Sequence, residues 1–282
     1  MCYYYTIINI LNLSRRHGVS FYLRLMKHSI FKLSQQEFFE NGDQHFLSHL
    51  SIDCVIFGFH NNQLKVLLLE WTDTRQWCLP GGFIQKKEHI DQAAIRILNS
   101  RTGLDSIRLN QFYTFGDPNR ERGTQKTKRF KKINATSWFL ERFITIGYWA
   151  LVEFSKVVPS PDELSSACRW WNIDEVPPLM LDHNLILNKA LGSLQQNLND
   201  FPIGKELLPH KFTMPDLQSL YETILNKKLD RRNFQKKILA LDILDRLEER
   251  KQGGAHKAPY LYSFNAKKYQ KALKQGLRFG LS

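Results

Sequence analysis

The 282-residue sequence has few cysteines and no long apolar run. Its four cysteines, Cys2, Cys54, Cys78 and Cys168, include no CxxC zinc-binding pair and are too sparse for a disulfide framework, so we expect a reducing, cytoplasmic location. The apolar stretch at the N-terminus is about a dozen residues long, shorter than the ~20 needed to span a bilayer. Arginines follow this stretch and no small-residue cleavage site is present, so neither a membrane span nor a secretory signal is expected.

Acidic residues are also in deficit, with 27 Asp and Glu against 40 Lys and Arg and a formal net charge of +13. Hydrophobic residues (43%) suffice to form cores, which excludes a disordered or fibrous chain, and the length predicts about two domains. The positive charge is uneven: residues 203–282 hold 17 Lys and Arg against 8 Asp and Glu. This asymmetry predicts a polyanionic partner, with nucleic acid first and a membrane surface second, whereas a solvated basic face is the alternative.

Regular patterning of apolar residues begins near residue 48. Residues 1–47 are therefore predicted to be an extension of unknown role, and translation from Met26 is an open alternative. The expected strands are 51–59, 64–70, 109–117, 144–154 and 168–173, and the expected helices are 88–101 and 182–198. The first two strands form a predicted hairpin, and Asp182 is the expected N-cap of the second helix. Alternating sheet and helix over 48–198 indicate an α/β layer domain.

A basic segment, 122–139, interrupts these strands. We expect a solvated surface loop, and the alternative is an additional contact to DNA phosphates. The residues that would make this contact are Lys126, Lys128, Arg129, Lys131 and Lys132.

Residues 203–282 have the pattern of a winged helix-turn-helix domain. Thr213, with Asp216 three residues later, is the expected cap of a first helix whose apolar stripe runs from Leu217 to Ile224. Asp230 is expected to cap a second helix, which packs inward through Phe234, Ile238, Leu239 and Leu241. Two strand-like arms around Gly253–Gly254 then predict a β-wing. A second helix with basic residues near its start is typical of a recognition helix for the major groove.

The segment from Gly81 to Leu104 resembles the signature of the Nudix superfamily. The positions in register are Gly82, Glu88, Arg96, Leu98, Gly103 and Leu104. Nudix hydrolases carry carboxylates at three helix positions that are Ile97, Ser100 and Arg101 in this sequence. Those carboxylates hold Mg²⁺ against a pyrophosphate and activate water, which isoleucine, serine and arginine cannot do. The resemblance therefore implies the Nudix fold without ordinary hydrolysis and with no metal. A pyrophosphohydrolase with unconventional ligands is the runner-up.

Residues 48–280, including ELLPHKFTMPDLQSLYETILNKKLDRRNFQKKIL, are similar to the Nudix-related transcriptional regulators. This resemblance implies an α+β chain in which a Nudix-type α/β/α sandwich (48–198) senses a ligand and a winged helix domain (203–282) binds DNA. It also implies a homodimer on an operator with two half-sites, and an effector that is either a nucleotide-sugar such as ADP-ribose or a sugar such as arabinose. No cofactor is implied. An RNA or membrane-surface adaptor is a third hypothesis.

Two sets of site residues are predicted. The DNA-binding set comprises Arg231, Arg232, Asn233, Lys236, Lys237, Lys251 and Lys257, the first three at base edges and the lysines mainly at phosphates. The ligand-binding set comprises Glu88, Arg96, Tyr113, Asp117, Arg120, Arg142, Tyr148 and Trp170. Core packing is the alternative for the aromatic members, since Tyr113 and Phe115 share one strand face and such faces are usually buried.

Overall fold

The computed structural model describes residues 33–104, 107–120, 137–162, 164–200, 204–251 and 258–275. Within these residues, no helix is both long and apolar enough to cross a membrane.

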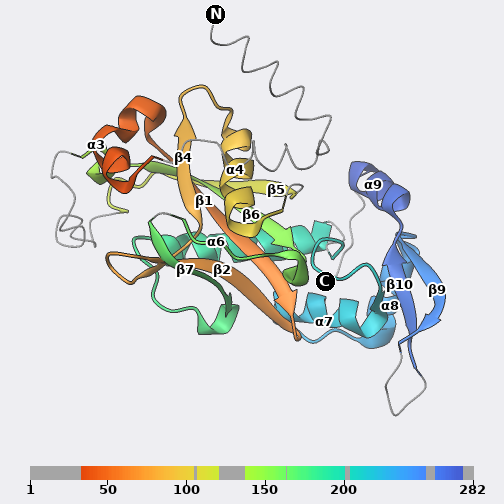
Figure 1. The fold of residues 1–282 in the computed structure, drawn as a ribbon. Coiled ribbons are helices and arrows are strands. Elements are labelled where there is room, and N and C mark those ends of the chain that lie inside the picture. The colour runs from red at the N-terminus through yellow and green to blue at the C-terminus, as the bar shows by residue number, and fades with distance from the viewer. Residues whose placement is uncertain are drawn as a thin grey trace, which may run out of the picture.

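A seven-stranded sheet forms the centre of the N-terminal part (Figure 1). Its strands are β1 (Phe46–His60), β2 (Gln63–Trp71), β3 (Trp77–Cys78), β4 (Gly81–Gln85), β5 (Leu109–Phe115), β6 (Ile144–Val152) and β7 (Ser165–Asn172). The order is β3-β2-β1-β6-β5, with β4 paired to β1 and β7 to β2. β1 and β6 run parallel, and the other pairs are antiparallel.

The predicted hairpin is confirmed. His60 of β1 pairs with Gln63 of β2, and the two residues between them, Asn61 and Asn62, have positive φ angles of 51° and 56°. Two consecutive left-handed residues make the tight turn that matches the twist of antiparallel strands, and asparagine adopts this conformation more readily than most side chains.

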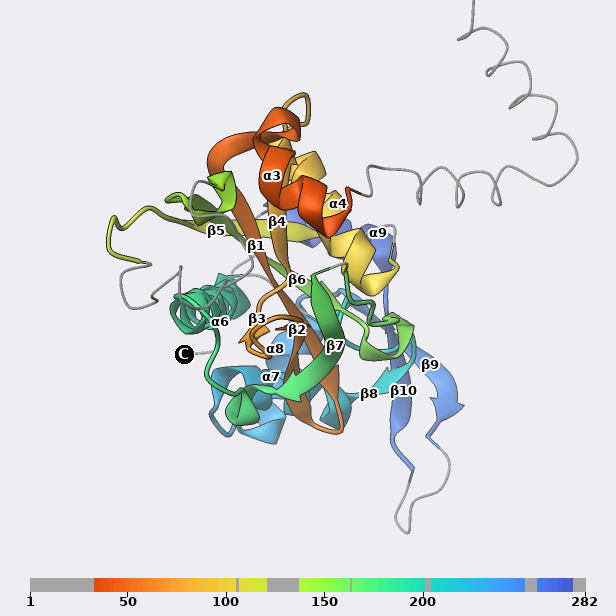
Figure 2. The same ribbon diagram turned by 60° about the vertical axis from the view of Figure 1, so that its left-hand side comes forward.

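Two helices cover opposite faces of the sheet, α4 (Ile90–Thr102) and α6 (His183–Asp200) (Figures 1 and 2). α4 begins with a capping box between His89 and Gln92, and it ends at Gly103, whose φ of 70° suits a residue without Cβ. Because side chains alternate along a strand, the even positions of β1 from 52 to 56 face the α4 cluster, while 55 and 57 face the α6 cluster. The layers make the expected α/β/α sandwich. Short 3₁₀ helices occur at Trp138–Leu140, Phe154–Lys156 and Ile173–Glu175.

Part of the predicted extension belongs to the folded unit. α3 (Gln35–His45) begins at the N-cap Ser34, and β1 already starts at Phe46. The Trp138 indole N–H donates to the carbonyl of Phe38 at 2.8 Å, and Trp138 is buried. The prediction of a solvated loop over 122–139 is therefore wrong for residues 137–139, because the Ser137 hydroxyl donates to the carbonyl of Phe39 and the rings of Trp138 and Phe139 pack against α3. Lys126, Lys128, Arg129, Lys131 and Lys132 lie outside the described residues.

The C-terminal part is a winged helix. Its elements are β8 (Phe212–Thr213), α7 (Met214–Leu225), α8 (Arg231–Ala240), β9 (Leu244–Arg250), β10 (Tyr260–Phe264) and α9 (Ala266–Gln275), with the three strands ordered β8-β10-β9. The capping box between Thr213 and Asp216 is confirmed, as is the Asp230 cap of α8. The tip of the wing, including Gly253–Gly254, lies outside the described residues.

One packing prediction for α8 is wrong. Phe234 and Ile238 are buried, but Leu239 is 43% exposed. The first two are four residues apart and share one helical face, whereas position 239 is turned about 100° away from 238. The helix also ends at Ala240, before the chain turns at Asp242 with a φ of 50°.

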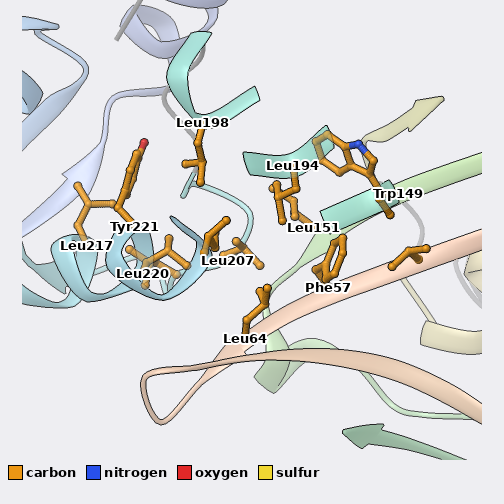
Figure 3. Close-up of a cluster of buried hydrophobic side chains, with 14 of the residues drawn as sticks. Phe57, Leu64, Trp149, Leu151, Leu194, Leu198, Leu207, Leu217, Leu220 and Tyr221 are labelled. Carbon is orange, nitrogen blue, oxygen red and sulfur yellow. The ribbon is translucent and has the colours of Figure 1, made fainter. Parts of the chain in front are cut away.

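The two parts of the chain share one hydrophobic core (Figure 3). It joins the α6 face of the sheet, through residues such as Phe57 and Leu64, to buried side chains of α7 such as Leu217 and Leu220. Leu207, in the segment between α6 and β8, lies between them and is buried as well. The winged helix is therefore packed against the sheet rather than merely tethered to it.

Candidate functional site

Glu88, one of the positions that match the Nudix signature, forms an ion pair with Arg96. Its carboxylate accepts two bonds of 2.7 Å from the Arg96 guanidinium and a third from the N–H of Gln85 at 3.1 Å. Arg96 also donates to the carbonyl of Phe83. Burial raises the pKa of Glu88, but the Arg96 and Gln85 bonds more than offset this effect, so its pKa lies below the usual range. The pair fixes the loop ahead of α4.

The three positions of α4 at which Nudix hydrolases carry carboxylates make contacts within the protein. Ile97 is buried in the core between α4 and the sheet, and Ser100 Oγ donates to the carbonyl of Ile97 at 2.6 Å. Arg101 pairs with Asp162 at 2.5 Å, and its side chain is only 11% exposed. Within the described ranges, no three His, Cys, Asp or Glu side chains are placed to hold a metal ion.

A buried polar cluster lies at the start of α6, on the face of the sheet that this helix covers. Asp53 of β1 is buried, and its carboxylate lies 3.9 Å from His183 Nε2. His183 Nδ1 accepts from the N–H of Leu79 at 2.9 Å, so in the neutral ring Nε2 carries the proton and faces Asp53. A Cβ at Gly81 would lie 2.5 Å from the Asp53 carboxylate, so only glycine fits there. Burial raises the pKa of Asp53, against the opposing charges of His183 and Arg120.

Arg120 and Asp182 close this cluster. The guanidinium donates two bonds of 2.8 Å to the Asp182 carboxylate and a third to the carbonyl of Phe143 at 3.1 Å. The side chains are 5% and 10% exposed. Asp182 lies at the predicted N-cap position, directly before α6, where its backbone carbonyl accepts from the N–H of Ile186 and its carboxylate accepts from Arg120.

The predicted ligand residues fall into two groups. Tyr113 lies on β5, Asp117 and Arg120 lie in the segment that follows it, and Arg142 lies just before β6. Tyr113 is 48% exposed, and the ammonium of Lys189 from α6 lies 4.3 Å from its ring centre. The core alternative is therefore wrong for Tyr113: its ring lies 4.8 Å from that of Phe115 on the edge strand β5, but only Phe115 is buried. Arg142 is exposed and donates to the carbonyl of Gly116 at 2.6 Å, while Asp117 accepts from the N–H of Asn119.

The remaining predicted ligand residues lie around α4. The Tyr148 hydroxyl donates to Asp91 at 2.8 Å, and Tyr148 itself is 2% exposed. Trp170 packs over Gly58 and against Phe154, with ring centres 5.2 Å apart. Sequence reasoning placed these two with Tyr113, but the sheet separates them because its two faces are covered by different helices.

The helix predicted to recognise DNA, α8, presents a basic surface. Arg231, Arg232, Asn233 and Lys236 are exposed on α8, and Lys237 is half-buried. Glu222 of α7 fixes the preceding turn by accepting from the N–H of Leu229 at 2.9 Å and from Gln218 at 3.0 Å. The Leu229 N–H bond lowers the pKa of Glu222, with help from Gln218 and Lys228. Lys251 is exposed at the start of the wing tip, 3.4 Å from Asp216, whereas Lys257 lies outside the described residues.

Comparison with known families decides the class of the chain. The NUDIX domain family matches residues 47–189, half of the sequence. The chain belongs to the Nudix family. Residues 204–264 match a second family, the NrtR DNA-binding winged helix domain, so the Nudix domain is followed by a winged helix of the NrtR type.

Individual relatives agree with this assignment. The "ADPR responsive transcriptional repressor NtrR" of Acinetobacter baylyi is 27% identical over 227 residues, 78% of this chain and 83% of that protein. The crystal structure of Shewanella oneidensis NrtR is similar with a TM-score of 0.62 and 26% identity, covering 77% of this chain and 94% of that one. The same protein complexed with a 27mer DNA superposes with a TM-score of 0.62 at 24% identity, over 78% and 95% of the two chains.

The sequence analysis did not identify two residues with structural roles: Asp53 in the Nudix domain and Glu222 in the winged helix. Asp53 is a lone acid in the apolar run SIDCVIFGF, and a charge at a strand position that should be buried is the signal that marks it. Glu222 carries no such signal, because a glutamate on an amphipathic helix is normally solvated. Its role depends on the turn that brings Leu229 back to it.

Proposed function

We propose that the protein is a ligand-responsive transcriptional repressor that binds operator DNA through its winged helix. The observation that most supports this proposal is the exposed basic face of α8. Glu222 holds the turn before this helix, and the domain matches the NrtR DNA-binding winged helix family. Arg231, Arg232 and Asn233 would reach base edges, and Lys236, Lys237, Lys251 and Lys257 would contact phosphates.

The proposed effector is ADP-ribose or a related nucleotide-sugar. The name of the Acinetobacter baylyi relative supports ADP-ribose rather than arabinose. On the sensing domain, 48–198, the proposed contacts are Tyr113 as a stacking face and Arg142 and Arg120 as partners of the anionic diphosphate, beside Asp117. Glu88, Arg96, Tyr148 and Trp170 lie around α4, away from Tyr113 and Arg120, so they are proposed to shape the domain rather than to touch the effector.

The Nudix domain is proposed to sense without hydrolysing. Ile97 is buried, Arg101 is paired with Asp162, and Glu88 is paired with Arg96. These side chains do not fit a Mg²⁺ site, which requires several oxygen ligands that are free to coordinate. The alternative, a pyrophosphohydrolase, predicts release of AMP from ADP-ribose in the presence of Mg²⁺.

We also propose that the protein is a two-fold homodimer and that it acts in the cytoplasm, where its operator is. Two copies of α8 would read half-sites about one helical turn apart, ~34 Å. Sedimentation of the protein with and without a palindromic duplex measures this: two chains per duplex support the dimer, and one chain contradicts it.

The decisive test is a binding titration with DNA from upstream of the protein's own and neighbouring genes. We expect a specific complex that ADP-ribose weakens and that NAD and pentoses leave unchanged. Equal competition by random DNA would support the nonspecific adaptor instead. Mg²⁺-dependent turnover of ADP-ribose by the same preparation would support the hydrolase.

A further inference from the structure

α6 is anchored at its first turn to the residues proposed to meet the effector. Asp182, which precedes the helix, receives the two bonds from Arg120, and both side chains are almost fully buried. His183, the first residue of the helix, accepts from the N–H of Leu79, in the loop that leads into β4. A displacement of Arg120 or of this loop therefore acts directly on the start of α6.

The other half of α6 is anchored to the winged helix. Leu194 and Leu198 are fully buried in the core shared with α7 (Figure 3). Gln195 Nε2 donates to the carbonyl of Ile224, in the last turn of α7, at 2.9 Å. Gln195 lies twelve positions after His183 along the helix, a span of roughly 18 Å.

α7 in turn holds the start of α8, the proposed recognition helix. Gln218 donates to the carbonyl of Leu229 at 3.0 Å, and Glu222 accepts from the N–H of the same residue. Leu229 lies directly before the N-cap of α8. Bonds and buried packing thus run without a gap from Arg120 through α6 and α7 to the start of α8.

We propose that α6 is the element through which the effector changes operator affinity, with Arg120 and Asp182 as its input and Gln195 and Ile224 as its output. This inference rests on the proposed function. An anionic effector competes with Asp182 for the Arg120 guanidinium, because both offer oxygens to the same donors. The start of α6 then shifts, and the helix moves as a unit against α7.

A second connection exists at the β1–β2 turn, where Ser219 and Thr223 of α7 contact Asn62. Both bonds lie at the exposed surface, where water competes for the same groups. Neither is attached to the polar cluster by a side chain. We therefore assign the coupling to α6 and use the turn as the comparison.

The test measures two affinities of the full-length protein: that of ADP-ribose without DNA, and that of the operator with and without saturating ADP-ribose. The two operator affinities give a coupling ratio. Gln195→Met removes the donor to Ile224 and keeps the side-chain length. Gln196→Met, at the exposed neighbouring position, is the matched control, and Ser219→Ala tests the turn. Thermal unfolding of each variant shows whether it is folded.

We expect Gln195→Met to bind ADP-ribose within about twofold of wild type and to lose about fivefold of the coupling ratio, the size expected for one hydrogen bond. Gln196→Met and Ser219→Ala retain the ratio. An unchanged ratio in Gln195→Met, or a loss in Ser219→Ala alone, overturns the assignment to α6 while the repressor function stands. A wild-type protein with no ADP-ribose response overturns both.

Discussion

The carboxylate of Glu222 accepts a 2.9 Å hydrogen bond from the backbone N–H of Leu229, seven residues further along the chain. This bond closes the turn between α7 and α8, because Leu229 immediately precedes the cap of α8. Glu222, whose side chain is 16% exposed, thus holds the turn from which α8 starts.

Replacing Glu222 with Ala is expected to weaken operator binding by about tenfold, since the N–H of Leu229 and the amide of Gln218 lose their acceptor. Lys228→Ala is the control: Lys228 also pairs with Glu222, but it is 94% exposed and such a pair contributes little. Fluorescence anisotropy with a labelled operator measures both. Equal losses in the two variants would show that the ion pair between Glu222 and Lys228, not the bond to Leu229, matters.

Glu222 also gives a pH dependence to stability. Its pKa is lowered in the folded protein, so the folded state binds fewer protons there than the unfolded chain. The stabilisation is present above the unfolded value of about 4.5 and is lost as the pH falls through the folded pKa. The difference in unfolding free energy between wild type and Glu222→Gln should therefore be largest near neutral pH and shrink below about pH 4. Urea titrations of both proteins across this pH range measure the difference. A difference in unfolding free energy that does not change with pH would contradict the prediction.

Lys236→Ala should weaken binding to all DNA sequences alike and lower the slope of log affinity against log salt by about one, because a phosphate contact releases counterions without reading bases. Lys271→Ala, an exposed lysine on α9, is the control for net charge. Salt titrations on operator and random DNA measure the slopes. Identical slopes for Lys236→Ala and Lys271→Ala would remove Lys236 from the interface.

Ile97→Glu restores a carboxylate of the Nudix signature but is not expected to restore Mg²⁺-dependent hydrolysis. Ile97 is 2% exposed, so an ionised carboxylate there should cost about 3 kcal/mol or more of unfolding free energy. Ile97→Val should cost only about 1 kcal/mol. Denaturant unfolding and a product assay with ADP-ribose measure both outcomes; a stable, active Ile97→Glu protein would contradict the placement of this side chain.

The shared core predicts joint unfolding of the two domains. Leu220→Ala, in the winged helix, should cost about 2–5 kcal/mol because Leu220 is fully buried, whereas exposed Leu239→Ala should cost less than about 0.5 kcal/mol. All six tryptophans lie between positions 71 and 171, in the Nudix domain. Tryptophan fluorescence therefore reports the domain that was not mutated. An unshifted fluorescence transition in Leu220→Ala would show that the domains unfold separately.

Elements with local signals could be predicted. The Asn61–Asn62 turn, the Thr213–Asp216 capping box and the helix after Glu88 depend on residues within four positions of one another, and all are present. Arg120 and Asp182, by contrast, are 62 residues apart, and Trp138 lies 100 residues from the carbonyl to which it donates. No local pattern specifies such partners, which is why the pairing of Arg120 with Asp182 was not predicted and the loop over 137–139 was predicted wrongly.

The sequence by itself determined the family, the order of the two domains and the loss of carboxylates at positions 97, 100 and 101, because these depend on residue identity and spacing. The tertiary structure decided which predicted site residues meet. The sheet separates Tyr148 and Trp170 from Tyr113 and Arg120, since each face is sealed by a different helix. It also decided that the domains share a core, because Leu194 and Leu198 bury against α7 only when α6 is folded across the sheet.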